Sequence, residues 1–213
     1  MNLRESLELY FIMGSQNCLK HPVLVLEEAI VGGITMFQFR EKGTKGLKGH
    51  ARVKLAIELQ HMCRKYSVPF IVNDDVELAL FIDADGVHIG QEDAPIEGVR
   101  RKIGGKLLGV SCHNRKEAGL AMESGADYLG VGPMFPTDTK QDCRKVRGPG
   151  VIQSIRAGGI GIPLVGIGGI HEKNASQVLK AGADGVAVIS AISRNPCRTG
   201  MLARAVRDTL LES

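Results

Sequence analysis

Short apolar runs alternate with helix-like stretches along almost the whole chain. Each run has four or five residues, is rich in aliphatic side chains and is bounded mainly by Gly, Pro or polar residues, which is typical of buried strands. The runs lie at residues 9–13, 36–40, 70–73, 86–89, 107–111, 128–131, 164–167 and 186–189. Helical spacing or capping signals predict helices at 23–31, 47–66, 76–82, 96–103, 114–124, 149–157, 174–181 and 198–211.

One phrase recurs in this pattern and limits the choice of fold. AGADGVAVIS, which begins at Ala181, is echoed by SGADYLGVG at Ser124 and by IDADGVHIG at Ile82. A repeated helix–strand unit in a parallel sheet forms either an open doubly wound sheet or a closed barrel. Eight strands, each followed by a helical pattern, predict the closed form: an α/β fold of the (β/α)8 or TIM-barrel type, with residues 1–213 as a single domain.

Three residues mark helix starts. Asn114 and Glu117 have the spacing of a capping box, and Asn174 can cap the helix that follows it. Gly168-Gly169, just before that helix, supplies a tight turn whose bare backbone N–H groups can approach a ligand.

Composition excludes several classes of function. The net charge of +4 over 213 residues is mild and its Lys and Arg residues are dispersed, which argues against a nucleic-acid partner. The five cysteines lack CxxC spacing and are expected to be reduced thiols rather than disulfides or zinc ligands. Without a signal-peptide pattern or a membrane-spanning apolar run, the sequence predicts a soluble, cytoplasmic protein that does not act at a membrane.

Chemistry in such barrels lies on the loops that follow the strands, so the residues there are the candidates. After the second strand, alternation puts Gln38, Arg40 and Lys42 on one side and Phe39 and Glu41 on the other. One interpretation of these residues is a solvated cluster of loop charges with no ligand. Two cations and an amide at a barrel mouth favour a site for a di-anionic group.

Carboxylates follow the third and fourth strands. Asp74 and Asp93 stand at adjacent strand ends and can share one hard cation, since Mg²⁺ takes one or two protein carboxylates together with waters and phosphate oxygens. Asp75 is assigned instead to capping the helix that starts near Val76. The sequence therefore predicts Mg²⁺ as the cofactor, held by Asp74 and Asp93.

The later strand ends carry two further features. His113 is either a general base or a hydrogen-bonding structural residue, and no nucleophile–base pair marks it as catalytic. The loop from Gly132 to Gly148 is long for this fold and is expected to act as a lid or ligand clamp, with hydroxyls at Thr137 and Thr139 and a charge at Lys140.

The last two strand ends indicate a second anion site. Gly168-Gly169 and Ile189-Ser190 stand where many barrels hold a phosphate on backbone N–H groups, although the glycines could also serve the turn alone. Two phosphorylated ligands over one barrel mouth suggest group transfer with a phosphate or pyrophosphate leaving group.

A family resemblance adds to this account. The chain resembles the thiamine-phosphate synthase family, in order and over nearly its whole length, in FQFREKG, FIVNDDVELAL, DGVHIGQED, LGVSCH, YLGVGPMFPTDTK, VGIGGI and AGADGVAVISAI. The resemblance implies that hydroxymethylpyrimidine diphosphate is joined to thiazole phosphate with release of pyrophosphate. It assigns pyrimidine-diphosphate contacts to Gln38, Arg40, Lys42, Asn73, Ser111 and Lys140, Mg²⁺ to Asp74 and Asp93, and thiazole-phosphate contacts to Thr137, Thr139, Gly169, Ile189 and Ser190.

The implied mechanism is dissociative. Pyrophosphate leaves first, and the thiazole nitrogen captures the resulting pyrimidine cation, so no protein nucleophile is needed. Arg40, Lys42, Lys140 and Ser111 are the expected catalytic residues, since they would stabilise the departing charge together with Mg²⁺. Two alternatives remain: a thiazole tautomerase of the same superfamily, which would use His113, and a non-catalytic phosphate-binding barrel.

Overall fold

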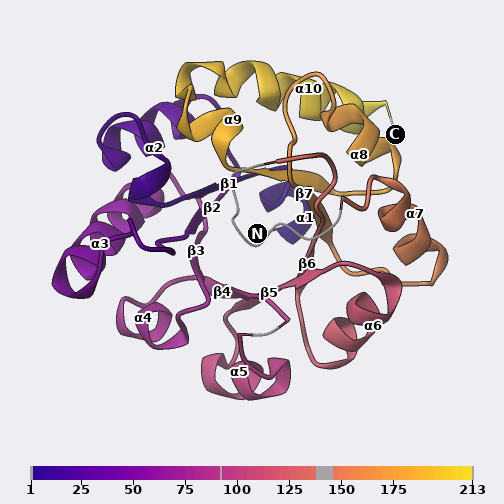
Figure 1. Cartoon of the computed structure of the whole chain (residues 1–213), viewed down its shortest axis with the longest axis horizontal. Helices are drawn as coiled ribbons and strands as arrows, with labels where there is room; N and C mark the ends of the chain where they lie inside the picture. Colours follow the sequence, from indigo (N-terminus) through magenta and orange to yellow (C-terminus); the bar gives the residue numbers. More distant parts are fainter. Residues whose placement is uncertain (1, 92, 138–145, 213) are drawn as a thin grey trace.

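A computed structural model describes residues 2–91, 93–137 and 146–212. Its centre is a closed barrel in which each strand is parallel to both neighbours, in the sequence order β1 to β8 (Figure 1). The strands are β1 (Leu9–Met13), β2 (Met36–Phe39), β3 (Phe70–Asn73), β4 (Gly86–Ile89), β5 (Leu107–Cys112), β6 (Tyr128–Val131), β7 (Leu164–Ile167) and β8 (Gly185–Val188). The predicted TIM barrel is therefore confirmed, with strand ends displaced by no more than one residue.

Helices surround the barrel on its outside (Figure 1). They are α2 (Pro22–Val31), α3 (Gly49–Lys65), α4 (Val76–Phe81), α5 (Ile96–Ile103), α6 (Arg115–Glu123), α7 (Gly150–Ala157), α8 (Ala175–Lys180) and α10 (Thr199–Leu211). The sequence pattern did not predict the short elements, which are α1 (Leu3–Ser6), η1 (Ser15–Asn17), α9 (Ser190–Ser193) and η2 (Pro196–Arg198). Elements of three or four residues are too short to show helical periodicity. None of the helices in the described part of the chain has the length and apolarity needed to cross a membrane.

The strands separate two apolar layers. Alternate side chains of β1, such as Phe11, face outward and pack beneath the helices in the larger core, while Tyr10 and Ile12 face the barrel axis. The inner layer consists of Leu7, Tyr10, Ile12, Met36, Ile71, Tyr128, Val165, Ala187 and Ile189. The barrel is thus a packed core, and its open space lies at one end.

The recurring Ala-Asp phrase has a structural role at the opposite end. Asp85, Asp127 and Asp184 each precede an even-numbered strand, and each carboxylate accepts a backbone N–H at the start of the preceding odd strand, at 2.8, 2.7 and 2.8 Å. Arg100 and Arg156 donate to the last two of these carboxylates from α5 and α7. The repeats therefore join neighbouring strands at the amino-terminal face, where barrels keep residues for stability.

The helix caps differ in one respect from the sequence prediction. Asn114 caps α6 by accepting the Glu117 N–H at 2.9 Å, as predicted. Asn174 does precede α8, but its side chain makes no capping hydrogen bond. It accepts the His171 N–H and donates to the Gly169 carbonyl instead, so the predicted cap is wrong. The Asn174 amide stabilises the glycine turn instead of the helix, because the Gly169 carbonyl in that turn needs a hydrogen-bond donor.

Candidate active site

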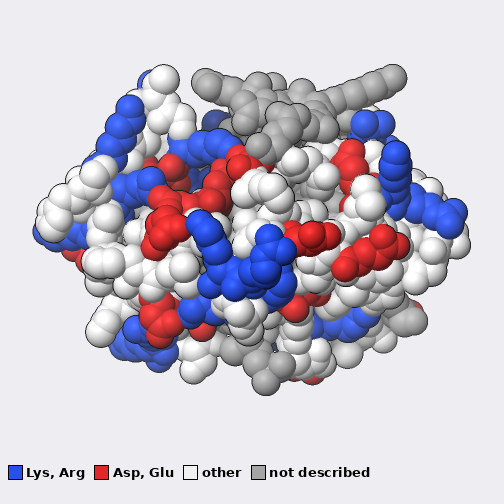
Figure 2. All heavy atoms as spheres, turned by 90° about the horizontal axis from the view of Figure 1, so that it is seen from below, with Lys and Arg blue, Asp and Glu red and all other residues white. Residues whose placement is uncertain are grey.

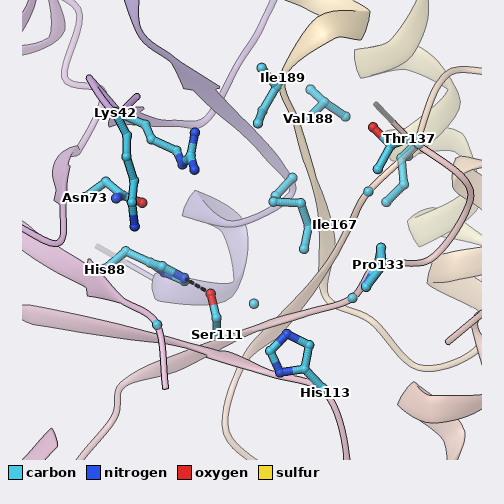
Figure 3. A pocket seen from close by; sticks show the side chains of 18 of the residues that line it. Lys42, Asn73, His88, Ser111, His113, Pro133, Thr137, Ile167, Val188 and Ile189 are labelled. Atoms are coloured by element: carbon cyan, nitrogen blue, oxygen red, sulfur yellow. Dashed lines mark hydrogen bonds between the residues drawn. The ribbon is translucent and has the colours of Figure 1, made fainter. Parts of the chain in front are cut away.

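A cavity of about 310 Å³ opens at the carboxyl ends of the strands. Its described walls come from the loops after β2 to β8, so seven successive strand ends contribute side chains or backbone (Figure 3). The sequence-predicted residues that line it are Arg40, Lys42, Asn73, Asp74, Asp93, Ser111, Thr137, Gly169, Ile189 and Ser190. His113 lines it as well.

Three predicted residues do not line this cavity as described. Gln38 is buried inside the barrel, 1% exposed, where its Nε2 donates to the Tyr10 hydroxyl at 2.7 Å. Thr139 and Lys140 lie outside the described residues, as does the part of the predicted lid between residues 138 and 145.

The carboxylates and Lys42 form one ionic cluster on the cavity wall. Lys42 Nζ lies 2.8 Å from Asp74 Oδ2 and 3.6 Å from Asp93 Oδ1. Burial raises the pKa of Asp74, which also shares a hydrogen bond with Asp93. Burial acts in the same direction on Asp93, but the hydrogen bonds it accepts and the charge of Lys42 lower the pKa of that carboxyl overall. The pair therefore holds one proton more readily than two isolated carboxyls would.

The two carboxylates of this cluster are the described residues that could hold the Mg²⁺ expected from the sequence. Both groups are hard oxygen donors, and a divalent cation bound to them would compete with the Lys42 ammonium. Among the described residues no group of three or more His, Cys, Asp or Glu side chains could hold a metal, so the donor set is limited to a pair of carboxylates. Mg²⁺ suits such a set because it retains waters and takes phosphate oxygens as further ligands.

Asp75, the neighbour of this pair, has a different role. Its Oδ1 accepts the Leu78 N–H at 2.9 Å and so caps α4, which confirms the sequence assignment. Asp74 adopts the left-handed backbone conformation, with φ of +62°. That unusual conformation directs one of two adjacent carboxylates to the cavity and the other to the helix.

The loop that carries Arg40 and Lys42 is fixed from outside the cavity by Glu41. The Glu41 carboxylate accepts the Ser15 N–H at 2.8 Å, the Ser15 hydroxyl at 2.6 Å and the Leu47 N–H at 2.8 Å. Gln16 Nε2 donates to the carbonyls of Arg40 and Lys42, each at 3.2 Å. The predicted alternation therefore holds for Glu41, whose bonds to the β1 loop leave its two cationic neighbours facing the cavity.

The glycine turn after β7 is tightly packed as well as bent. Gly168 and Gly169 have φ of +102° and +65°. A Cβ on Gly169 would come within 2.5 Å of the Pro136 carbonyl oxygen and 2.9 Å of the Phe135 Cβ. Glycine is thus required both by the backbone conformation and by the segment that follows β6, and the backbone at this turn remains open to the cavity.

His113 pairs with Glu117, a contact that the sequence analysis did not predict. Its Nδ1 lies 2.9 Å from Glu117 Oε2, and the same oxygen accepts its backbone N–H at 2.7 Å. His113, Asn114 and Glu117 therefore form one local hydrogen-bonded group at the start of α6.

Two polar side chains of the cavity wall, His88 and Gln91, were missed altogether. His88 Nε2 lies 2.9 Å from Ser111 Oγ (Figure 3). Gln91 Nε2 donates to the Ser111 carbonyl at 2.7 Å. A signal was present for His88, because it is a polar residue at an inward-facing position of an otherwise apolar strand. Nothing in the sequence marks Gln91, whose role depends on the neighbouring strand.

Charged side chains of both signs are spread over the outer surface seen in Figure 2, with no single-sign patch covering that face. This distribution agrees with the dispersed charge in the sequence.

The fold and its polar cavity define the class of protein: a (β/α)8 barrel whose cavity opens at the carboxyl-terminal face, where enzymes of this fold carry their active sites. The chain belongs to the thiamine monophosphate synthase family, whose profile matches residues 9–192. Its relatives make it a transferase of thiamine biosynthesis, which excludes the non-catalytic alternative.

The similarity covers almost the full length of known proteins. A thiamine-phosphate synthase of Geobacillus kaustophilus is 57% identical over 208 residues, which are 96% of this chain and 94% of the relative. One from Bacillus cereus strain B4264 is 59% identical over 187 residues, 88% of this chain and 85% of the relative. The structure of thiamine phosphate pyrophosphorylase from Pyrococcus furiosus superimposes with a TM-score of 0.87 at 39% identity, covering 98% of this chain and all of that one.

Proposed function

We propose that this chain joins hydroxymethylpyrimidine diphosphate to thiazole phosphate, forming thiamine phosphate and releasing pyrophosphate. One observation carries the proposal: a single cavity is lined both by the ionic cluster of Lys42, Asp74 and Asp93 and by the backbone turns at Gly169 and Ile189. The first wall suits a diphosphate with a metal ion. The second wall has little side-chain charge and suits a monophosphate held on N–H groups.

In this mechanism the bond between the pyrimidine methylene carbon and the diphosphate oxygen breaks first. The electron pair leaves with pyrophosphate, and the thiazole nitrogen then donates its lone pair to the pyrimidine cation. Arg40 and Lys42, together with Lys140 from the β6 loop, stabilise the charge on the departing group. Mg²⁺ held by Asp74 and Asp93 would neutralise part of the same charge.

The surroundings of the reacting groups agree with the absence of covalent catalysis. Cys112 follows Ser111 and is the nearest thiol in sequence to the cavity, but its side chain is fully buried and burial raises its pKa to about 12. A thiol with that pKa is almost entirely protonated at neutral pH and is a poor nucleophile. Catalysis here consists of positioning and electrostatic stabilisation.

The test is pyrophosphate release measured with both substrates and with each one omitted. Release that needs both substrates and Mg²⁺ and accompanies thiamine phosphate formation supports the proposal. Lys42→Ala should reduce turnover on the order of a hundredfold, the usual effect of removing one transition-state contact. Lys45→Ala is the matched control, since Lys45 is exposed in the same loop and does not line the cavity. Equal effects of the two substitutions would contradict the proposal.

The relatives identify a transferase, but the His113–Glu117 pair is a feature that the second candidate, the thiazole tautomerase, would also use. A carboxylate on Nδ1 orients an imidazole for proton transfer, which an isomerase needs and a dissociative synthase does not. The two functions differ in their sensitive residue. The synthase predicts a severe loss for Lys140→Ala and a mild one for His113→Ala in single-turnover pyrophosphate release, whereas the reverse order would favour the tautomerase.

A further inference from the structure

A continuous series of hydrogen bonds, called the relay below, crosses the barrel interior and ends at the cavity. It runs through Gln38, Tyr10, Tyr128, His88 and Ser111. Gln38 Nε2 lies 2.7 Å from the Tyr10 hydroxyl, which lies 2.8 Å from the Tyr128 hydroxyl. Tyr128 OH lies 3.2 Å from His88 Nδ1, and His88 Nε2 lies 2.9 Å from Ser111 Oγ. Strands β1, β2, β4, β5 and β6 each contribute one member. Among these five residues only Ser111 is more than 8% exposed, so the relay begins in the core and reaches solvent at Ser111.

The donor and acceptor groups of the five side chains determine which residue donates in each hydrogen bond of the relay. An amide nitrogen can only donate, so the Tyr10 oxygen accepts from Gln38 and its single proton is left for Tyr128. Tyr128 has then accepted one bond and has its own proton for His88 Nδ1. Burial raises the pKa of both phenols far above neutrality, so each keeps the proton that it donates.

The direction determines the tautomer of His88. An imidazole that accepts at Nδ1 carries its proton on Nε2, and that proton points to Ser111 Oγ. The Ser111 oxygen is thus an acceptor toward His88, and its hydroxyl proton remains for a group in the cavity. If every donor and acceptor in the relay were exchanged, Ser111 would donate to His88 and would offer only lone pairs to a ligand.

We propose that this relay fixes the Ser111 hydroxyl as a hydrogen-bond donor toward the cavity. Its ligand there is an acceptor-only group, such as a phosphate or diphosphate oxygen. His88 and Tyr128 are positioning residues, since they act through Ser111 and determine which chemical group that point of the wall recognises. The ligand class rests on the proposed function, whereas the direction of the relay does not.

The first test measures the His88 tautomer without any substrate. Nitrogen-15 chemical shifts of the histidine rings distinguish the two neutral tautomers, and His88→Gln assigns the His88 signals among the six histidines. The relay predicts a neutral ring with its proton on Nε2. A proton on Nδ1, or a doubly protonated ring at neutral pH, would overturn the proposal whether or not the protein is a synthase.

The second test cuts the relay at a distance from the cavity. Tyr128→Phe removes the donor to His88 Nδ1, and the Nδ1–H tautomer should then become populated. Inorganic pyrophosphate with Mg²⁺ serves as the acceptor-only probe, and its binding should weaken about five- to tenfold, the effect of one hydrogen bond to a charged group. Tyr66→Phe makes the same chemical change at a half-exposed residue outside the barrel and controls for loss of a phenol hydroxyl.

A double-mutant cycle separates positioning from a structural effect. In a Ser111→Ala background the relay has no hydroxyl to orient, so Tyr128→Phe should not weaken pyrophosphate binding further. Additive losses would show that Tyr128 acts on the fold rather than through Ser111, and they would overturn its positioning role. Tyr10→Phe provides an independent cut in case Tyr128→Phe unfolds the barrel. It should shift the His88 tautomer in the same direction but less, because Tyr128 keeps its proton and loses only the bond that directs this proton to His88.

Discussion

Replacing Gly169 by Ala tests whether close packing against the segment after β6, in addition to the positive φ, requires glycine in the turn after β7. At φ of +65° an L-residue meets a backbone penalty of roughly 1–2 kcal/mol. The added Cβ would also lie 2.5 Å from the Pro136 carbonyl oxygen, so the backbone of one loop has to move. Overpacking of this kind costs a further ~1–3 kcal/mol.

Gly159→Ala is the matched control for this substitution. Gly159 also has a positive φ, +79°, but a Cβ added there would meet no described heavy atom within 4 Å. It therefore reports the backbone penalty alone. Since 1 kcal/mol shifts Tm by about 2–4 °C in a domain of this size, we expect Gly169→Ala to lower Tm by several degrees more than Gly159→Ala.

Binding measurements complete the test of the Gly169 turn. Isothermal titration should show about tenfold weaker binding of thiazole phosphate to Gly169→Ala, equivalent to ~1.4 kcal/mol, with little change for the pyrimidine diphosphate. Identical Tm values for the two alanine variants would refute the packing argument. Equal losses of affinity for both ligands would refute the assignment of this turn to the thiazole phosphate.

Three further predictions concern carboxylates. Asp74→Asn should raise the Mg²⁺ concentration needed for half-maximal turnover, whereas Asp75→Asn should not, because Asn caps α4 as well as Asp does. Glu41→Gln should raise KM for the diphosphate substrate, since an amide accepts poorly from the Ser15 and Leu47 N–H groups that fix the loop. Burial opposes ionisation of Glu117, but the bonds from His113 and Asn114 lower its pKa overall. Its stabilising contribution is then present above the unfolded pKa and is lost as pH falls through the folded one, so Glu117→Gln should flatten the loss of Tm between about pH 5 and pH 3.

Local pattern was sufficient for most of the fold. Each buried strand is a run of apolar residues between helix-breaking or polar neighbours, and these signals depend only on the sequence close by. The same holds for Asp75 and Asn114, whose carboxylate and amide cap helices that begin directly after them. Asn174 was predicted wrongly because its side chain has two local choices, and the strained turn at Gly169 offers the better one.

Much of the candidate site could also be predicted, because a closed barrel brings every strand end to one face. Arg40, Asp74 and Asp93 were expected at the mouth from their places at strand ends, and Ser111 from the family resemblance, and all four line the cavity. The sequence could not establish that Asp74 and Asp93 share one lysine. That contact depends on side chains from three strands meeting across a distance set by the barrel.

The barrel interior was decided by the tertiary structure alone. Gln38 was expected at the barrel mouth and His88 was not singled out, because alternation indicates the face of a strand but not the partner that a side chain meets there. Their partners, Tyr10, Tyr128 and Ser111, come from strands that are distant in sequence and converge on one axis. A buried donor has to find an acceptor wherever the fold provides one, and it is closure of the sheet that determines which one it meets.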